Sequence, residues 1–406
     1  MSFFQWSIGI YSGTDWRRLV PQSESNPVLS AESVSDLKAK FVADPFMARE
    51  GGRWWMFFET MPVEGGRGVI GLASSEDARH WSYHQTVLAE PFHLSYPQVF
   101  LWNGEWFMLP ETAERRSVRL YRAREFPLRW EFESELISNA LLDPTVFHHL
   151  GMWWIFASPD NSTLLIYYAE KLQGPWLPHP ANPIVKDNAM IARPAGRVIT
   201  HNGQLFRLGQ DSIPFYGTRV RAFAIDELSL SEYCETEIAA SPILSATRQP
   251  AWNGFGMHHA DIHQLEDGTF LACVDGSRLA HEQAPETNSG YGICKACVVA
   301  TGYDARAACL ARRLVADSIQ VHVMLIEAAD RVDTQIRPAR VDGAILHRIK
   351  INPSNPQARE ITTMVLWALQ TGLGIDHFHV LEPSLIEGVR SALGEDSPRI
   401  VEEYGA

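Results

Sequence analysis

The chain has 406 residues, of which 46% are hydrophobic, and it carries a formal net charge of −13 at pH 7. This charge argues against a nucleic-acid partner, because binding a phosphate backbone requires a basic face. No run of 18 apolar residues is present, so no membrane span is expected.

The cysteines and the N-terminus bear on the cellular compartment. The five cysteines are odd in number and lie late in the chain, which favours free thiols in a reducing cytoplasm. Cys294 and Cys297 form a CxxC pair inside an expected strand, without the second pair of a zinc site. The first residues, MSFFQWSIGIYSG, have no basic region ahead of the apolar ones and do not resemble a signal peptide. We therefore expect a cytoplasmic protein without a cofactor.

A hairpin pattern occurs five times along the chain. Residues 4–13 predict a strand and residues 20–38 a polar connector, and then an apolar strand, a glycine turn and an aromatic-rich strand recur. The turn glycines, spaced 52, 47, 52 and 65 residues apart, are Gly52, Gly104, Gly151, Gly203 and Gly268. Repeats of roughly 40 to 50 residues with several short strands are typical of β-propeller blades. We predict an all-β five-bladed propeller over residues 1–302, closed by residues 4–13; an irregular β-sandwich is the alternative.

From residue 303 the pattern changes to mixed α/β. Helices are predicted over residues 304–315, 355–372 and 383–394, and strands over residues 318–327, 339–351 and 377–382. We predict a small α/β domain or appendage over residues 303–406. It contains no glycine-rich nucleotide motif, and the sequence assigns it no chemistry.

The predicted blades bring polar residues together. The first strand of each blade lines the axis, so the residues heading the five copies should converge: Asp44, Tyr96, Asp143, Arg193 and His258 or His259. A second set lies seven residues after each turn glycine: Glu59, Glu111, Ser158, Gln210 and Asp275. One Asp-Pro pair alone would indicate a turn with a capping aspartate. Polar residues at this position in five blades favour a functional site.

Basic residues near the axis suggest an anionic ligand. Arg193 and Arg197, with His258 and His259, provide donors for a phosphate or carboxylate. Alternatively, the arginines pair with Asp44, Asp143 or Asp211 as a structural network. Strand alternation places His259, Asp261 and His263 on one face, where they have the chemistry of metal ligands. We predict no metal, and keep this trio as the alternative.

Several long segments carry a family resemblance. They are WSIGIYSG (6–13), FVADPFM (41–47), EPFHLSYPQVF (90–100), RPAGRV (193–198) and GMHHADIH (256–263). These segments resemble the N-terminal domain of plant glucosamine inositolphosphorylceramide transferases and its bacterial homologues. The plant proteins carry a separate transferase domain, which is not evident in this sequence. The DPF, YPQVF and DPTVF segments also resemble the five-bladed propellers of family 43 glycoside hydrolases, over roughly residues 39–300.

The glycosidase resemblance implies roles for individual residues. Asp44 stands at the position of the base and Asp143 at that of an aspartate that tunes the pKa. Arg193 stands where those enzymes have a glutamic acid, and an arginine cannot donate a proton at neutral pH. Ordinary hydrolysis therefore requires a relocated acid, for which Glu111 is the candidate.

These observations lead to one functional prediction and two alternatives. We predict a protein of glycan or glycoconjugate biosynthesis that performs glycosyl transfer with an anionic sugar, phosphorylated or nucleotide-linked, bound at the axis. The alternatives are a non-catalytic carbohydrate-binding propeller and a glycoside hydrolase that uses Glu111 as its acid. The predicted catalytic residues are Asp44, Asp143 and Glu111, and the predicted substrate contacts are Tyr96, Arg193, Arg197, His258, His259 and Asp261. The sequence predicts neither the sugar and its linkage nor the oligomeric state.

Overall fold

The chain divides into two compact units in a computed structural model. The structure describes residues 2–22, 26–213, 216–247, 251–281, 295–300, 305–316, 320–328, 339–341, 344–351, 366, 375, 377–381, 389 and 399–402. One unit consists of Gln5–Ser212 and Tyr216–Arg278, and the other of Met1–Phe4, Ile213–Phe215 and Leu279–Ala406. None of the described helices is long and apolar enough to cross a membrane.

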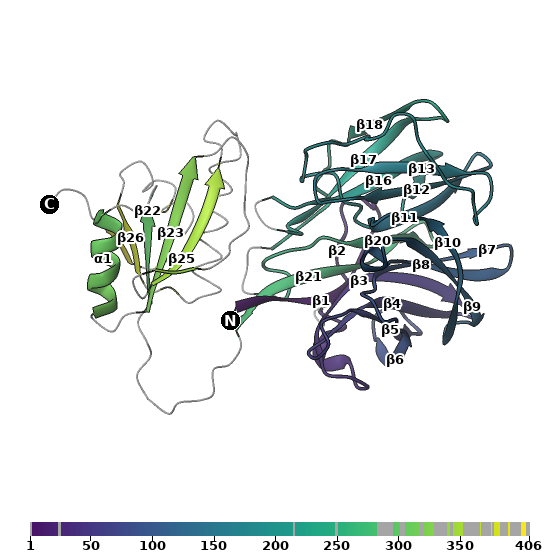
Figure 1. The fold of residues 1–406 in the computed structure, drawn as a ribbon. Coiled ribbons are helices and arrows are strands. Elements are labelled where there is room, and N and C mark those ends of the chain that lie inside the picture. Colours follow the sequence, from purple (N-terminus) through teal and green to yellow (C-terminus); the bar gives the residue numbers. More distant parts are fainter. Residues whose placement is uncertain are drawn as a thin grey trace. The chain divides into compact units, whose positions relative to one another are not determined.

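The larger unit is a five-bladed β-propeller (Figure 1), as predicted from the five repeats. The first blade contains β3 (Ala39–Glu50), β4 (Arg53–Pro62), β5 (Val69–Ser75) and β6 (Ser82–Leu88). The second contains β7 (Ser95–Trp102), β8 (Glu105–Glu111), β9 (Val118–Glu125) and β10 (Arg129–Ile137). The third contains β11 (Leu142–His149), β12 (Met152–Ser158), β13 (Leu165–Ala169) and β14 (Leu177–Pro178).

The last two blades are less regular. The fourth contains β15 (Ile199–His201), β16 (Gln204–Asp211), β17 (Arg219–Leu228), β18 (Tyr233–Glu237) and β19 (Leu244–Ser245). In the fifth, β20 (Ala260–Gln264) and β21 (Phe270–His281) are joined by β1 (Ser2–Gly13) and β2 (Val20–Pro21), in the order β2-β1-β21-β20. Residues 4–13, expected to close the ring, therefore lie in the same sheet as the fifth repeat.

The heads of the first three blades share a strained backbone. Asp44 and Pro45 together face the single residue Phe58 on the neighbouring strand, which makes a β-bulge. Asp44, Tyr96 and Asp143 occupy equivalent positions and have φ angles of 51°, 48° and 47°. Left-handed residues other than glycine are uncommon and cluster at functional sites. The Asp-Pro pairs are thus bulges within first strands, and each bulge re-aims the side chain at its head.

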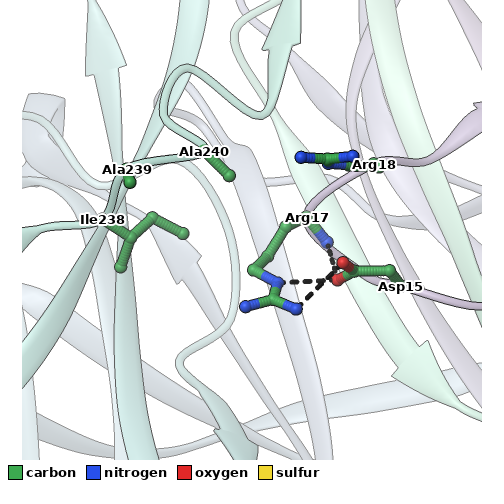
Figure 2. Close-up of a pocket in the computed structure, with 6 residues that line it drawn as sticks. All are labelled: Asp15, Arg17, Arg18, Ile238, Ala239 and Ala240. Atoms are coloured by element: carbon green, nitrogen blue, oxygen red, sulfur yellow. Dashed lines mark hydrogen bonds and ion pairs between the residues drawn. The ribbon is translucent and has the colours of Figure 1, made fainter.

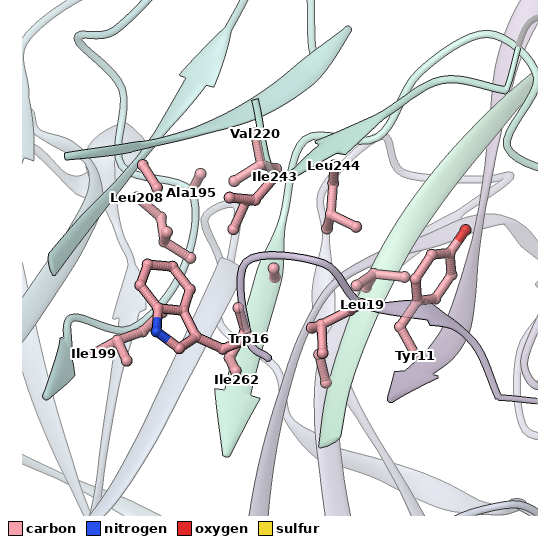
Figure 3. Packing of buried hydrophobic residues seen from close by; sticks show 14 of the residues in the cluster. Tyr11, Trp16, Leu19, Ala195, Ile199, Leu208, Val220, Ile243, Leu244 and Ile262 are labelled. Carbon is pink, nitrogen blue, oxygen red and sulfur yellow. The ribbon is translucent and has the colours of Figure 1, made fainter. Parts of the chain in front are cut away.

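Apolar side chains fill the space between blades. Figure 3 shows Trp16, from the connection between β1 and β2, packed with Ile199 and Leu208 of the fourth blade and Ile262 of the fifth. Trp16 is only 1% exposed. Burying such a large side chain stabilises the fold, and here it ties the N-terminal segment to two blades.

The smaller unit contains a six-stranded sheet in the order β24-β25-β23-β22-β26-β27. Its strands are β22 (Lys295–Ala300), β23 (Gln320–Ala328), β24 (Ala339–Val341), β25 (Ala344–Ile351), β26 (His377–Val380) and β27 (Arg399–Glu402). All neighbouring pairs are parallel except β24 with β25, and α1 (Ala305–Ala316) packs on β22 and β23. If β22, β23, β25, β26 and β27 are numbered 1 to 5 in chain order, they lie across the sheet in the order 3-2-1-4-5. This order is typical of a doubly wound sheet.

The predicted elements of this unit compare as follows with the described residues. Helix 304–315 and the three strand regions are present as α1, β23, β24 with β25, and β26. Helices 355–372 and 383–394 lie outside the described residues, apart from Leu366 and Val389. Strand β22 belongs to this sheet, although it precedes the boundary expected at residue 303. The α/β sheet therefore begins earlier in the sequence than predicted.

Candidate functional site

An arginine and an aspartate from two blades form an ion pair at the axis. The Arg193 guanidinium contacts Oδ2 of Asp143 through Nε at 2.8 Å and through Nη2 at 2.7 Å. Gln210 Nε2 donates to the same oxygen at 2.7 Å, and Arg193 Nη2 lies 3.7 Å from Oε2 of Glu111. Arg193 therefore pairs with Asp143, as the alternative interpretation of the arginines expected. Asp143 in turn donates its backbone N–H to Glu111 Oε2 at 3.1 Å.

A histidine lies between two further carboxyl groups. His258 Nδ1 contacts Asp275 Oδ2 at 2.7 Å, and Asp275 also accepts the backbone N–H groups of His258 and Asp44 at 3.1 Å. These bonds orient the ring so that its other nitrogen, Nε2, faces Asp44 Oδ1 at 3.7 Å. That distance is too long for a hydrogen bond. The ring also stacks on Trp6, with centroids 4.1 Å apart.

Burial dominates the electrostatics of these acids. It raises the pKa of Asp44 to about 7, and the charges of Asp143 and Asp275 add to this effect while that of His258 opposes it. Burial likewise raises the pKa of Asp143 to about 7, against the opposing charge of Arg193. Groups with pKa values near neutrality are suited to accept and return protons, and they cluster at functional sites.

The pKa of His258 is raised, whereas burial alone would lower it. Burial disfavours the imidazolium of His258, but the Asp275 and Asp44 carboxylates outweigh it and raise the pKa of the ring. Burial also opposes the charge of Asp275, yet the nearby His258 lowers the pKa of Asp275 below its usual value. We conclude that Asp275 and His258 behave as a charged pair facing Asp44.

Four polar residues of this cluster were not among the predicted site residues: Glu59, Gln210, Tyr216 and Asp275. Glu59 is buried, and the neighbouring carboxyl groups of Asp44 and Glu111 act on it. Its signal in the sequence was its place in the set that follows the turn glycines. The ring centroid of Tyr216 lies 5.1 Å from Cζ of Arg193 and 5.1 Å from the centroid of the His258 ring. No repeat position pointed to Tyr216, because it lies in a connection between strands.

Arg197 and Asp261, both predicted substrate contacts, bind each other. Arg197 Nε donates to Asp261 Oδ1 at 2.7 Å, and Arg197 Nη2 donates to the Val99 carbonyl at 3.1 Å. Asp261 Oδ2 accepts the Met47 N–H at 2.7 Å and His263 Nε2 at 2.8 Å. These partners come from four blades, so the pair joins the blades to one another.

Tyr96 and His259 also have protein partners. The Tyr96 hydroxyl accepts the Gly196 N–H at 2.7 Å and lies 2.7 Å from Thr145 Oγ1. His259 Nε2 contacts the Pro45 carbonyl at 2.9 Å. Burial lowers the pKa of His259 to about 4, so the ring is neutral at pH 7. Both side chains bridge blades at the axis.

The contacts of Tyr96 give a stability prediction. Replacing Tyr96 with phenylalanine should lower the free energy of unfolding by about 1–3 kcal/mol, because the buried Gly196 N–H loses its acceptor. Urea unfolding measures this loss. The matched control is Tyr83→Phe, whose hydroxyl donates to Asp36 at an exposed position, and for which a smaller loss is expected. Equal losses for the two variants would contradict the bridging role.

The geometry bears on the metal alternative. Asp261 contacts His263 and Arg197, but His259 contacts the Pro45 carbonyl, so the ligand atoms of the trio do not converge on one point. Among the described residues, Asp44, His258 and Asp275 place ligand atoms within 4.8 Å of one another. The oxygens of Asp275, however, already accept N–H groups from the backbone and the imidazole. We therefore interpret this group as an oriented histidine facing a carboxyl group.

A surface pocket of about 260 Å³ is lined by none of these residues. It lies between the connection of β1 with β2 and the loop that follows β18 (Figure 2). Arg17, one of its two arginines, is held by Asp15 through hydrogen bonds of 2.7 and 2.9 Å. Apolar Ile238, Ala239 and Ala240 face the two residues, and we assign this pocket no chemistry.

Comparison with known proteins gives the family. Residues 4–277 match the family described as glucosamine inositolphosphorylceramide transferase 1, N-terminal. The chain belongs to this family. The resemblance found in the sequence is thereby confirmed. Proteins named glucosamine inositolphosphorylceramide transferase 1 are similar: the one from Arabidopsis thaliana is 38% identical over 298 residues, and the one from Oryza sativa subsp. japonica is 36% identical over 298 residues.

The family relatives are longer proteins. The matches cover 68% of this chain but only 39% of the Arabidopsis protein and 40% of the rice protein. The chain therefore spans about two fifths of the length of these relatives. Among solved structures, the catalytic domain of Coprinopsis cinerea GH62 α-L-arabinofuranosidase has a TM-score of 0.47 at 14% identity, over 67% of this chain and 97% of that one. The β-1,2-mannobiose phosphorylase from Listeria innocua has a TM-score of 0.49 at 13% identity, over 65% and 96%.

Proposed function

We propose that the propeller binds a sugar at the acid-rich end of its axis and acts in glycosyl transfer during glycoconjugate biosynthesis. The observation that carries the proposal is the convergence of Asp44 and Asp143, both with pKa values raised to about 7, beside Arg193 and His258. The transferase name of the family relatives supports the same reaction class.

Asp44 is the proposed base. Its carboxyl group accepts no hydrogen bond from the described residues, and it faces His258 across 3.7 Å. It would take the proton of an acceptor hydroxyl as that oxygen attacks the anomeric carbon of the sugar. Asp143 would position the sugar, because Arg193 and Gln210 fix its carboxylate. Glu111 is bound to the Asp143 backbone, so we place it among the positioning groups.

The proposal also specifies the charge of the ligand, which is an anion. An anionic sugar, phosphorylated or nucleotide-linked as the sequence predicted, would bind through Arg193, which already contacts Asp143. The carboxyl groups of Asp44, Glu111 and Asp143 lie near that arginine, so an anion requires some of them to be protonated. Binding of a sugar phosphate should therefore weaken as the pH rises through about 7, because Asp44 and Asp143 ionise. A neutral oligosaccharide should show a much smaller pH dependence.

A ligand screen tests the proposal. Sugar phosphates, nucleotide sugars and neutral oligosaccharides would be added to the 406-residue chain, and the melting temperature measured at pH 6 and pH 8. A ligand at 100 times its dissociation constant stabilises the folded state by about 2.7 kcal/mol. We expect one class to raise the melting temperature, and Asp143→Ala to remove the rise. If no class does so, or if the rise survives in Asp143→Ala, the axial site is not where sugar binds.

The two alternatives give different results in the same experiment. Binding without any transfer would support a carbohydrate-binding propeller. Release of free sugar from aryl glycosides, lost in Glu111→Gln, would support a glycoside hydrolase with Glu111 as its acid.

A further inference from the structure

The second strand of each blade carries a polar residue seven positions after its turn glycine. These residues, equivalent in the repeat, are Glu59, Glu111, Ser158, Gln210 and Asp275. The carboxyl groups of Glu111 and Asp275 each accept a backbone N–H from the head of the next blade, Asp143 in one case and Asp44 in the other, at 3.1 Å. At these two positions the carboxyl group therefore serves to hold neighbouring blades together.

Glu59 is the exception in this set. Its side chain is 8% exposed, and no described residue donates a hydrogen bond to its carboxyl group. The nearest donor is His93 Nε2, 3.6 Å from Glu59 Oε1, which is beyond hydrogen-bond distance. A buried carboxylate without donors is costly, so the neutral acid is the favoured form. A buried acid without a structural partner, at a position where its equivalents have one, is available for chemistry.

The surroundings of Glu59 favour the protonated form further. Burial is the main cause that raises the pKa of Glu59 well above its usual value, and the surrounding carboxylates add to it. They come from the first, second, third and fifth blades and are Asp44, Glu111, Asp143 and Asp275. The group that faces Glu59 from the connection before β7 is His93, and burial lowers the pKa of that ring, so it adds no positive charge at pH 7.

His93 lies beside Glu59 and is partly exposed to solvent. Its Nδ1 accepts the Gly68 N–H at 2.9 Å, so the neutral ring carries its proton on Nε2, the nitrogen that faces Glu59. The His93 side chain is 27% exposed. A side chain at Gly68 would lie 2.9 Å from Glu59 Oε1 and 2.4 Å from the Leu94 carbonyl oxygen, so only glycine fits beside this pair. Glu59 therefore lies one partly exposed side chain away from solvent, from which it can recover a proton.

We propose that Glu59 is the proton donor of the axial site and that the donor substrate is a glycoside with an alkoxyl leaving group; this rests on the proposed function. The bond between the anomeric carbon and the leaving oxygen breaks, that oxygen keeps the bonding pair, and it takes the proton of Glu59. The acceptor oxygen forms the new bond to the anomeric carbon and gives its proton to Asp44. Asp44 then releases this proton to solvent, and Glu59 recovers one from solvent. Phosphate is a good leaving group without protonation, so an unpaired acid indicates a poorer one. This narrows the anionic sugar of the proposed function to one whose phosphate is not the leaving group.

The first test needs no ligand. A carboxyl group whose pKa is raised by folding binds more protons in the folded state, so it lowers stability as the pH rises above about 4.5. Glu59→Gln resembles the neutral acid and removes this penalty. We expect a urea midpoint equal to that of the wild type at pH 4 and higher than it at pH 8. A midpoint lower than that of the wild type at pH 8 would mean that Glu59 is ionised and paired, and would overturn the proposal.

Asp275→Asn is the matched control, because Asp275 occupies the equivalent position in the fifth blade. Its pKa is lowered in the folded state, chiefly by His258 acting against burial, so its ionised form contributes stability above about 3.8 that is lost as the pH falls. Asp275→Asn should therefore lower the urea midpoint at pH 8, and the loss should shrink only as the pH falls below about 4. At pH 8 the urea midpoint should therefore rise in Glu59→Gln and fall in Asp275→Asn, each relative to the wild type.

The second test examines the reaction. Methyl glycosides and 4-nitrophenyl glycosides of hexoses and hexosamines serve as donors, with a neutral sugar as acceptor. Glu59→Gln should lower turnover of the methyl glycosides by about 10²–10⁴-fold and that of the nitrophenyl glycosides far less, because nitrophenolate departs without a proton. Equal losses for both donors would overturn the role of Glu59. If the wild type turns over neither donor, the donor role fails together with the proposed transfer. If the wild type turns over the donors and Glu59→Gln does so at the same rate, Glu59 is not the proton donor, and the proposed transfer still stands.

Discussion

Replacing Arg197 with methionine is expected to lower the free energy of unfolding by about 3–5 kcal/mol, because it leaves a buried carboxylate without its counter-charge. That carboxylate, Asp261, is fully buried and would keep only the Met47 N–H and His263 as donors. The Val99 carbonyl would also lose the Arg197 N–H. Since these groups belong to different blades, the loss should reduce the cooperativity of unfolding as well as its midpoint. Urea unfolding followed by tryptophan fluorescence measures both.

The control for this variant is an exposed ion pair of similar length. Arg53 Nη2 lies 2.6 Å from Glu76, but the two side chains are 40% and 81% exposed. Surface pairs of this kind contribute about 0–1 kcal/mol, so Arg53→Met should change stability little. Similar losses for Arg197→Met and Arg53→Met would show that burial does not determine how much an ion pair contributes to the free energy of unfolding. The interpretation of Arg197 as a link between blades would then be wrong.

The parts of the fold that were predictable are those written into local sequence. Glycine turns followed by aromatic-rich strands recur along the sequence, so the five blades could be counted from it. Asp44, Asp143 and Arg193 could be brought to one place because they occupy the same position in their repeats, and the structure places them in one cluster. Partners across blades were not predictable, because the pairing of Arg197 with Asp261 depends on side-chain direction and depth along the axis.

The remaining differences have the same physical origin. Strand β22 follows the fifth repeat closely in sequence, yet it pairs with β23 and β26 in the other unit, and strand propensity alone does not reveal the partner. Tyr216 lies in a connection without periodicity, so nothing in its neighbourhood pointed to Arg193. Glu59 could be located by its repeat position, but its lack of a hydrogen-bond partner became visible only with coordinates.

Asp44→Asn is expected to lower transfer by about 10²–10⁴-fold and to change sugar affinity little, because an amide keeps the size of the side chain but cannot take a proton. Asparagine also tolerates the left-handed backbone at this position, where φ is 51°, so the bulge should persist. The wild-type rate should rise as the pH passes about 7 and Asp44 ionises. Turnover and ligand-induced melting shifts, measured on the same preparations, separate the two effects.

The outcome for Asp44→Asn distinguishes a base from a binding group. Asp226→Asn, an exposed change in β17 with one hydrogen bond from Thr236, should leave both turnover and affinity as they are in the wild type. If Asp44→Asn loses affinity in proportion to turnover, Asp44 acts only by holding the sugar, and the propeller is a binding module. If it keeps full turnover, the base lies elsewhere. A loss of turnover with preserved affinity is explained only by a proton passing through Asp44, because the rest of the cluster is unchanged in size and position.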